Sequence, residues 1–192
     1  MGIDNKDLPK RKKNRWENYD YSSCGAYFIT VCTLEKRNYL GKVVGAISDR
    51  QQEANYLGNA LGEYDTPQIE LSEYGKLVEQ AILQIPMIYP ALSVDCYAIM
   101  PNHIHLLLIV HCDECGRSLI APTVSRVIRH MKSHVSKQIG IAIWQKSFHD
   151  HVIRNRQDYE EHVKYIFENP MRWYYDELYV EESKGYHYDK CD

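Results

Sequence analysis

The sequence predicts an α+β sandwich, in which one antiparallel sheet is covered by helices mainly on one face. Segments with strand and helix patterns follow one another in the order strand, helix, strand hairpin, helix, strand, helix. The chain has 192 residues, of which 44% are hydrophobic and 26% are charged, so it is long enough for one globular domain with an ordinary core. The only tight hairpin signal lies at Pro101 and Asn102, between two apolar runs.

This hairpin is the most informative stretch of the chain. Pro101 presets φ for the first central position of a turn, and Asn102 tolerates the second. Side chains alternate along a strand, so His103 and His105 face the same way, and two imidazoles on one face can bind one metal ion. Residues 106–110 are apolar at every position, which predicts a central strand covered on both faces.

The other elements are assigned from their composition and periodicity. Strands are predicted over 26–33, over 94–100 and within 141–155, and a short hairpin over 41–46 and 68–71. Ser72 begins a helix that Pro86 stops, and Pro122 begins another. A last helix covers 158–169 and is ended by Pro170, followed by a mostly helical aromatic tail. Residues 48–66 are too long and polar for a tight turn and are predicted to be an inserted loop.

Both ends of the chain differ in charge from the middle. The formal net charge is −3, but Lys12, Lys13 and four other cations crowd residues 1–18, which we interpret as a basic arm able to contact phosphates. A solvated tail explains the arm equally well. Residues 181–192 form an acidic C-terminal tail. No apolar run reaches the roughly 18 residues of a membrane span, so a cytoplasmic protein without a membrane partner is expected.

The six cysteines are scattered without a paired framework, which predicts reduced thiols. Only Cys112 and Cys115 have zinc-like spacing, and a polar turn explains this pair better than a metal site.

The helix after Pro122 is amphipathic. Its apolar face is predicted to be buried, whereas Arg126, Arg129 and Lys137 share the opposite side. These cations are candidates to follow a phosphate backbone, although a solvated face is the usual explanation for such a pattern.

Several motifs resemble those of one protein family. Met-Pro-Asn-His-Ile-His-Leu at 100–106 resembles the His-hydrophobe-His strand of the HUH nucleases, in the form found in REP-associated tyrosine transposases and their insertion-sequence relatives. The opening over 12–33, the Trp-Gln to Ile-Arg-Asn segment over 144–155, and Tyr-Ile-x-x-Asn-Pro over 165–170 resemble the same family. The resemblance covers about residues 10–179, with 48–66 outside it.

The resemblance implies a ferredoxin-like (RRM-like) catalytic domain over 19–180 that nicks single-stranded DNA and transfers the strand. Tyr165 would attack the phosphate and form a 5′-phosphotyrosine intermediate. His103 and His105 would bind Mg²⁺ or Mn²⁺, with Asn169 as a third ligand. Because Tyr165 and Asn169 are four residues apart, one helix can present both to the histidine strand.

The resemblance also implies a partner, single-stranded or hairpin DNA. His151 and Arg154 fall in the Trp-Gln segment and are predicted to support the site or contact DNA, whereas His149 falls on a variable position. A homodimer stays open, because relatives occur both as monomers and as dimers that share active sites.

Two other functions fit the residues. One is a metal hydrolase with a cluster of His103, His105, His149 and His151, in which water is the nucleophile and Tyr165 is structural. The other is a non-catalytic RRM-like module whose sheet stacks bases.

Overall fold

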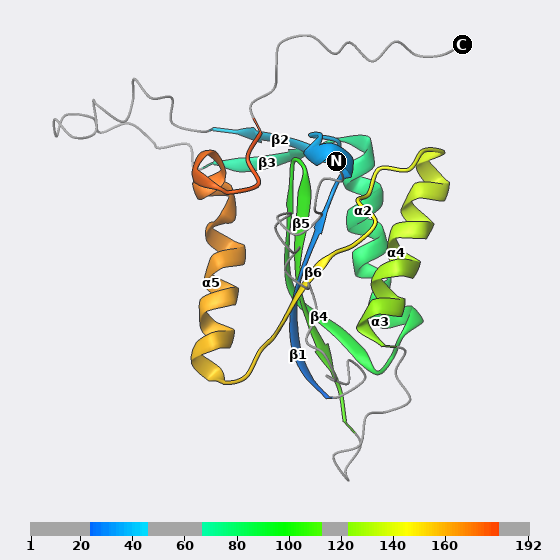
Figure 1. The fold of residues 1–192 in the computed structure, drawn as a ribbon, viewed down its shortest axis with the longest axis vertical. Helices are drawn as coiled ribbons and strands as arrows, with labels where there is room; N and C mark the ends of the chain where they lie inside the picture. Colours follow the sequence, from blue (N-terminus) through cyan, green and yellow to red (C-terminus); the bar gives the residue numbers. More distant parts are fainter. Residues whose placement is uncertain (1–23, 46–66, 113–122, 181–192) are drawn as a thin grey trace, which may run out of the picture.

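A four-stranded antiparallel sheet with the order β4-β5-β1-β6 organises the chain (Figure 1). The computed structural model describes residues 24–45, 67–112 and 123–180. The strands of the sheet are β1 (Gly25–Cys32), β4 (Leu92–Met100), β5 (His103–Val110) and β6 (His149–Val152). A separate ribbon joins β2 (Gly41–Val44) to β3 (Gln68–Leu71), which confirms the predicted short hairpin.

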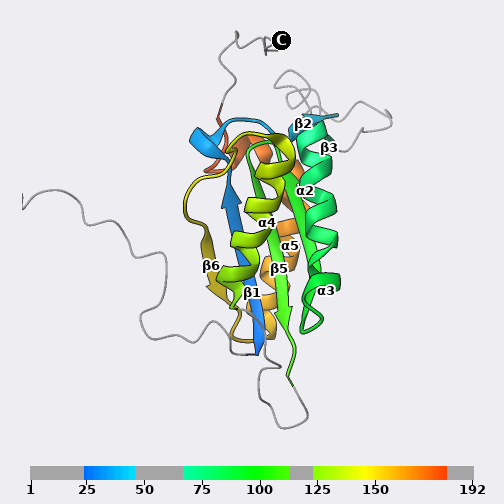
Figure 2. The same cartoon turned by 90° about the vertical axis from the view of Figure 1, so that its right-hand side faces the viewer.

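Helices cover both faces of this sheet, two of the long ones on one face. Helices α2 (Glu73–Leu83), α3 (Ile85–Ile88) and α4 (Val124–Ile139) lie on one side, and α5 (Arg156–Arg172) crosses the other (Figures 1 and 2). The succession β1, α2, β4, β5, α4, β6, with the sheet order above, is a ferredoxin-like arrangement to which α5 is added. The predicted α+β class is confirmed.

The central strand β5 has the hydrophobic core on one face and the layer formed by α5 on the other. Ile104, Leu106 and Leu108 are fully buried among apolar side chains of α2 and α4. His103 and His105 point to the opposite face, toward α5, because side chains alternate along a strand. The predicted central position of this strand is confirmed, since β5 pairs with β4 on one side and with β1 on the other.

Prolines shape two helix ends differently from the prediction. Pro86 does not stop the first helix: α2 ends at Leu83, and Pro86 occupies the first turn of α3, where its missing N–H has no helical acceptor to lose. The last helix was predicted to end at Pro170, but α5 continues to Arg172. One proline near the C-terminus costs a single backbone bond, and the buried ring of Trp173 follows directly.

The segment before β6 is mostly not a strand. Only His149–Val152 pairs with β1, so the strand predicted within 141–155 is short. The ammonium group of Lys132 on α4 instead donates to the carbonyl oxygens of Gln145, Lys146 and Ser147, at 2.5, 3.3 and 3.3 Å. These carbonyls are therefore held by a side chain rather than by a strand ladder.

Cys24 and Cys112 form a disulfide, so the prediction of reduced thiols is wrong for this pair. The antiparallel pairing of Gly25 with Val110 places the two cysteines at the same end of the β1–β5 ladder, with 5.6 Å between their Cα atoms. Cys115, the arm 1–18, the loop 48–66 and the tail 181–192 lie outside the described residues. Within the described ranges, no helix has the length and apolarity to cross a membrane.

We expect Gly75→Ala to destabilise the protein by about 2 kcal/mol or more, because a Cβ at position 75 would collide with the backbone carbonyl oxygen of Leu40. Helix propensity alone predicts the opposite sign, a gain of about 1 kcal/mol. Urea unfolding followed by circular dichroism measures the difference. Gln80→Ala, on the exposed side of the same helix, should stay within about 0.5 kcal/mol. A stabilised Gly75→Ala variant would contradict the close packing of α2 on Leu40.

Candidate functional site

On the sheet face that α5 covers, polar side chains of the neighbouring strands β5, β1 and β6 lie directly opposite one another. Thr30 of β1 pairs with His105 of β5 on one side and with His149 of β6 on the other, so all three point to this face. Phe28, two residues earlier, pairs with Leu107 and His151 in the same way. The second H-x-H of the sequence therefore lies two strands from the first, about 10 Å away at the usual strand spacing.

In each of the two histidine rings, Nδ1 contacts a polar side chain, whereas Nε2 has no partner among the described residues. The Nδ1 atom of His103 is 2.8 Å from Oδ1 of the buried Asn102, and Nδ1 of His105 is 2.9 Å from the hydroxyl of Thr30. The Asn102 contact favours the tautomer of His103 with the proton on Nδ1, whereas the Thr30 hydroxyl can either accept from Nδ1 of His105 or donate to it. Among the described residues, neither buried Nε2 atom has a hydrogen-bond partner. Two buried, unpaired lone pairs of this kind suit a metal ion.

Both imidazoles are held neutral. Burial, and then the nearby charge of Lys36, lowers the pKa of His103 to about 3. Burial, followed by the neighbouring His103, lowers the pKa of His105 well below its usual value. A neutral imidazole offers a lone pair to a cation, so the rings do not need to lose a proton before they bind one.

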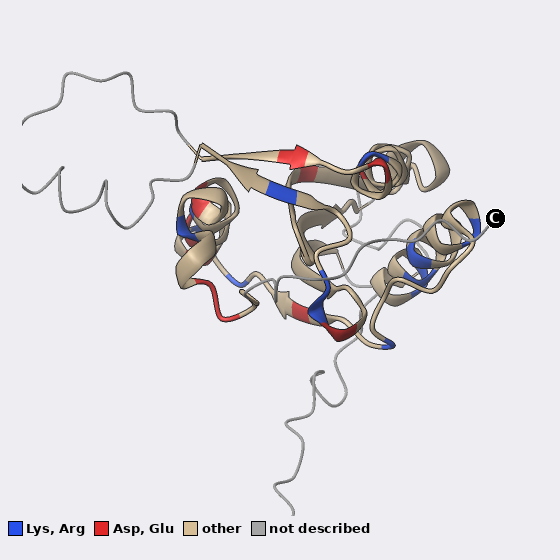
Figure 3. Cartoon of the chain, turned by 90° about the horizontal axis from the view of Figure 1, so that it is seen from above, with Lys and Arg blue, Asp and Glu red and all other residues tan. Residues whose placement is uncertain are grey.

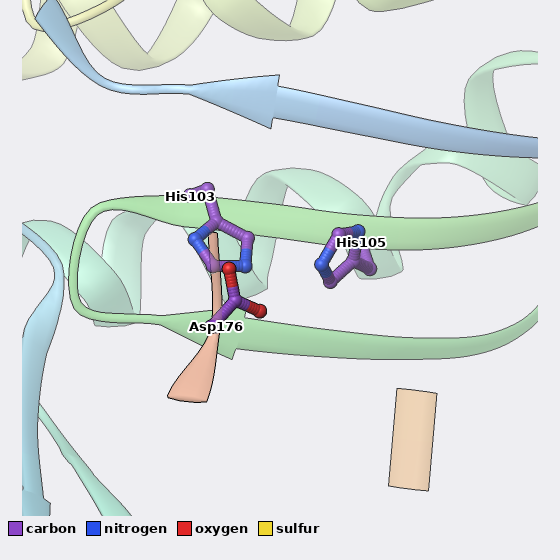
Figure 4. A group of neighbouring side chains, drawn as sticks. All are labelled: His103, His105 and Asp176. Atoms are coloured by element: carbon purple, nitrogen blue, oxygen red, sulfur yellow. The ribbon is translucent and has the colours of Figure 1, made fainter. Parts of the chain in front are cut away.

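Asp176 completes a cluster of three potential metal ligands. Its carboxylate lies beside the two rings, and the ligand atoms of His103, His105 and Asp176 are all within 4.8 Å of one another (Figure 4). Asp176 directly follows the 3-10 helix η2 (Trp173–Tyr175), and its Oδ1 accepts from the backbone N–H of Leu178 at 2.6 Å. Asn102 ties the histidine turn to this segment, because its Nδ2 donates to the carbonyl oxygen of Leu178 at 2.7 Å.

Tyr165 lies against the same cluster. Its hydroxyl donates to Oδ2 of Asp176 at 3.3 Å, and its ring centroid is 5.1 Å from that of His105. The side chain is 36% exposed and lines an open groove. Burial, and then the Asp176 carboxylate, raises the pKa of Tyr165 to about 12. The phenol is therefore protonated at neutral pH and needs a nearby positive charge to become a nucleophile.

Asn169 lies one turn after Tyr165 on α5 and is almost fully buried. Its Nδ2 donates to Oδ2 of Asp176 at 3.4 Å, and its Oδ1 has no partner among the described residues. The structure thus brings Tyr165, Asn169 and the histidine pair together around Asp176. The role of Asn169 as a metal ligand stays a prediction.

An open groove gives access to the cluster. Its lining comes from β1, β5, β6, α5 and the segment after η2, and includes Phe28, His105, His149, His162, Tyr165 and Asp176. His149 lines the groove but belongs to neither of the two clusters of potential metal ligands found in the described residues. The four-histidine cluster required by the hydrolase alternative is therefore not assembled.

The predicted DNA contacts are spread over both faces. Arg126, Arg129 and Lys137 are exposed on α4, a helix without any Asp or Glu, which packs on the sheet face opposite to the cluster (Figures 1 and 3). His151 is 3.0 Å from both carboxylate oxygens of Asp158, and Arg154 is exposed just after β6. Lys12 and Lys13 lie outside the described residues. These DNA contacts stay predictions.

Sequence reasoning missed three residues of this site. Asp176 is 73 positions from His103 and lies in an aromatic segment that was interpreted as packing. Thr30 and Asn102 were assigned only to a strand and a turn. The register of β1 against β5, which follows from neither pattern alone, gives Thr30 its contact with His105.

The chain is similar in sequence and fold to known proteins. No family model matches the chain. A protein of Haemophilus influenzae described as a putative REP-associated tyrosine transposase is 26% identical over 167 residues, which are 83% of this chain and 77% of that protein. The REP-associated tyrosine transposase of Escherichia coli is 26% identical over 98 residues, 50% of this chain and 54% of that protein. A solved structure, that of a REP-associated tyrosine transposase bound to a REP hairpin, has a similar fold, with a TM-score of 0.54 and 21% identity over 82% of this chain and 73% of that one.

We expect Asp176→Asn to weaken Mn²⁺ binding at least about tenfold, because a neutral amide replaces the only carboxylate of the His103 cluster. Isothermal titration measures the affinity, and the His103→Ala/His105→Ala variant should show no binding at this cluster. Glu177→Gln removes the next carboxylate along the chain and serves as the matched control. Equal losses in the Asp176 and Glu177 variants would mean that only the local charge matters.

Proposed function

We propose that this chain, a relative of the REP-associated tyrosine transposases in sequence and in fold, nicks single-stranded DNA with Tyr165 and keeps the 5′ end as a phosphotyrosine. The observation that supports this most is the contact between the Tyr165 hydroxyl and Asp176, the carboxylate that shares a cluster with His103 and His105. A nucleophile and three potential metal ligands thereby lie together, and Tyr165, His105 and Asp176 among them line one groove.

The residues of the cluster fit a divalent cation. Two buried Nε2 atoms lack partners and a carboxylate lies beside them, so His103, His105 and Asp176 would hold the ion, with Asn169 as a further candidate ligand. When bound, Mg²⁺ or Mn²⁺ supplies Lewis-acid stabilisation of the charge on the phosphate oxygens. Imidazole also binds zinc and nickel well, so the two histidines do not by themselves select Mg²⁺ or Mn²⁺. The oxygen ligands that Asp176 and Asn169 would supply favour these two ions.

The chain's own residues position the nucleophile and accept its proton. Oδ2 of Asp176 accepts the Tyr165 hydroxyl hydrogen bond and is placed to receive the proton as the phenol oxygen attacks phosphorus. The bond from phosphorus to the 3′ oxygen then breaks, and that oxygen takes up a proton, passed on through water from the protonated Asp176, to become a free 3′-hydroxyl. Asn102 and Thr30 orient the two imidazoles through their Nδ1 atoms.

The covalent intermediate makes strand transfer the reverse of cleavage. A 3′-hydroxyl of another DNA end attacks the phosphotyrosine, and Tyr165 leaves. The energy of the phosphodiester is kept in the protein linkage, so no other energy source is required.

The substrate proposed is single-stranded DNA beside a hairpin. The related structure is bound to a REP hairpin, and the groove here is lined by aromatic rings suited to unpaired bases. His103, His105, Asp176 and Tyr165 all come from one chain, so a homodimer is not needed to complete the site. The cytoplasmic location stays a prediction.

We expect Tyr165→Phe to abolish nicking and the protein–DNA adduct while folding and DNA affinity are kept, because only the attacking oxygen is removed. Incubation with hairpin-flanked single-stranded DNA and Mn²⁺, followed by a denaturing gel, measures both products. Tyr159→Phe is the matched control on the same helix, since its hydroxyl donates to Asp95 of β4 rather than to the cluster. If Tyr165→Phe still nicks, water or another tyrosine is the nucleophile and the hydrolase alternative gains support.

We expect replacement of Arg126, Arg129 and Lys137 by Gln to weaken DNA binding and to lower the slope of log affinity against log salt by about 2, as expected for three lost contacts with single-stranded phosphates. Fluorescence anisotropy at several salt concentrations measures the slope. Lys76→Gln, on α2, which covers the same face of the sheet, should leave the salt slope unchanged. An unchanged slope in the triple variant would show that the α4 cations are only a solvated surface.

A further inference from the structure

A second group of potential metal ligands lies where β6 meets the first turns of α5. His151 comes from β6, and Asp158 and His162 come from α5, one turn apart. One ligand atom from each of the three residues lies within 4.8 Å of the other two. No part of the proposed cleavage reaction uses this group. We call it the His151 cluster.

We propose that the His151 cluster is a second metal site, which binds a late first-row cation such as Zn²⁺ through His151, Asp158 and His162. Two imidazoles and one carboxylate bind such cations well. The first cluster has the same three ligand types, but there the unpaired Oδ1 of Asn169 is a further oxygen candidate, which suits Mg²⁺ or Mn²⁺ better. The inference goes beyond the proposed cleavage reaction and does not depend on it.

The distances within the cluster are close to those of a bound site. Nε2 of His151 is 3.0 Å from both oxygens of Asp158, and Nδ1 of His162 is 3.1 Å from Oδ1 of Asp158. Ligands of a tetrahedral zinc ion at bonds of about 2.0–2.1 Å are separated by about 3.3 Å. The two distances to Asp158 are therefore within a few tenths of an ångström of those around a bound ion, and the ligand atoms of His151 and His162 lie within 4.8 Å of each other. The rings of His151 and His162 already lie nearly parallel, 4.7 Å apart.

The backbone holds the carboxylate in place before any ion binds. Oδ2 of Asp158 accepts from the backbone N–H of Arg154 at 2.9 Å, and Asn155 caps the helix by accepting from the Asp158 N–H at 2.9 Å. Nδ1 of His162 also lies 2.7 Å from the backbone carbonyl oxygen of Asp158, so without an ion this nitrogen carries a proton and donates it there. A bound cation would displace that proton and replace this hydrogen bond.

The His151 cluster would fix the helix that carries Tyr165. His162 is three residues before Tyr165 on α5, and the Phe28 ring contacts both His162 and His105, with centroid distances of 4.6 and 5.1 Å. An ion here would join α5 to the edge strand β6, while the exposed His151 leaves one side open to water or to a phosphate oxygen.

Cobalt binding tests this site separately from cleavage. In a His103→Ala/His105→Ala background without an affinity tag, Co²⁺ should give the visible absorption bands of low-coordinate cobalt, and His151→Gln or His162→Gln should remove them and weaken Zn²⁺ binding at least about tenfold. His149→Gln is the matched control, because it lies on the same strand and face but outside the cluster. Circular dichroism verifies folding; if the background variant does not fold, the same substitutions are compared in the otherwise unaltered chain by difference spectra.

Absent bands, or bands that persist in both the His151 and His162 variants, would overturn the proposal. So would their loss in His149→Gln with retention in His162→Gln. Because the background lacks the histidine pair, none of these results depends on whether Tyr165 cleaves DNA.

Discussion

The alternation of side chains along β5 is the constraint on which the rest of the structure depends. Ile104, Leu106 and Leu108 fill the core against α2 and α4, and the residues between them, together with His103, face α5. A slip of one residue in the pairing with β1 would bury the imidazoles in the core and expose the leucines. The packing of the hydrophobic core therefore fixes which way the imidazoles point. The same β1–β5 register determines both the stability of the core and the position of the candidate site.

The groups between the sheet and α5 are only partly satisfied by one another. Burial keeps His103 and His105 neutral, so they do not form ion pairs with Asp176. Burial and the same carboxylate raise the pKa of Tyr165. A positive charge placed among these groups would pair with the lone pairs of the imidazoles, compensate the carboxylate and stabilise a phenolate. This charge balance is the physical basis of the proposal that the cluster binds a cation.

Much of the fold could be predicted from the sequence because local patterns specify it. Three local patterns predict their structures directly: the apolar run 106–110 a central strand, Pro101-Asn102 a hairpin turn, and Ser72 the start of a helix. The candidate site was predicted in part: the histidine pair and Tyr165 follow from periodicity and resemblance. Asp176 and His162 could not be predicted, because their positions depend on how far α5 continues past Pro170 and on how it crosses the sheet. The Cys24–Cys112 disulfide likewise follows only from the β1–β5 register.

A bulge in the edge strand β4 determines how α5 is anchored. The pairing with β5 shifts between Val94 and Cys96, which leaves Asp95 out of the ladder, and its carboxylate accepts the Tyr159 hydroxyl from the first turns of α5. At the other end, Asn169 contacts Asp176. These two contacts hold Tyr165 close to the sheet. In the proposed reaction the DNA would therefore bring its scissile phosphate to the groove, and DNA sequences whose strand bends easily would be the better substrates.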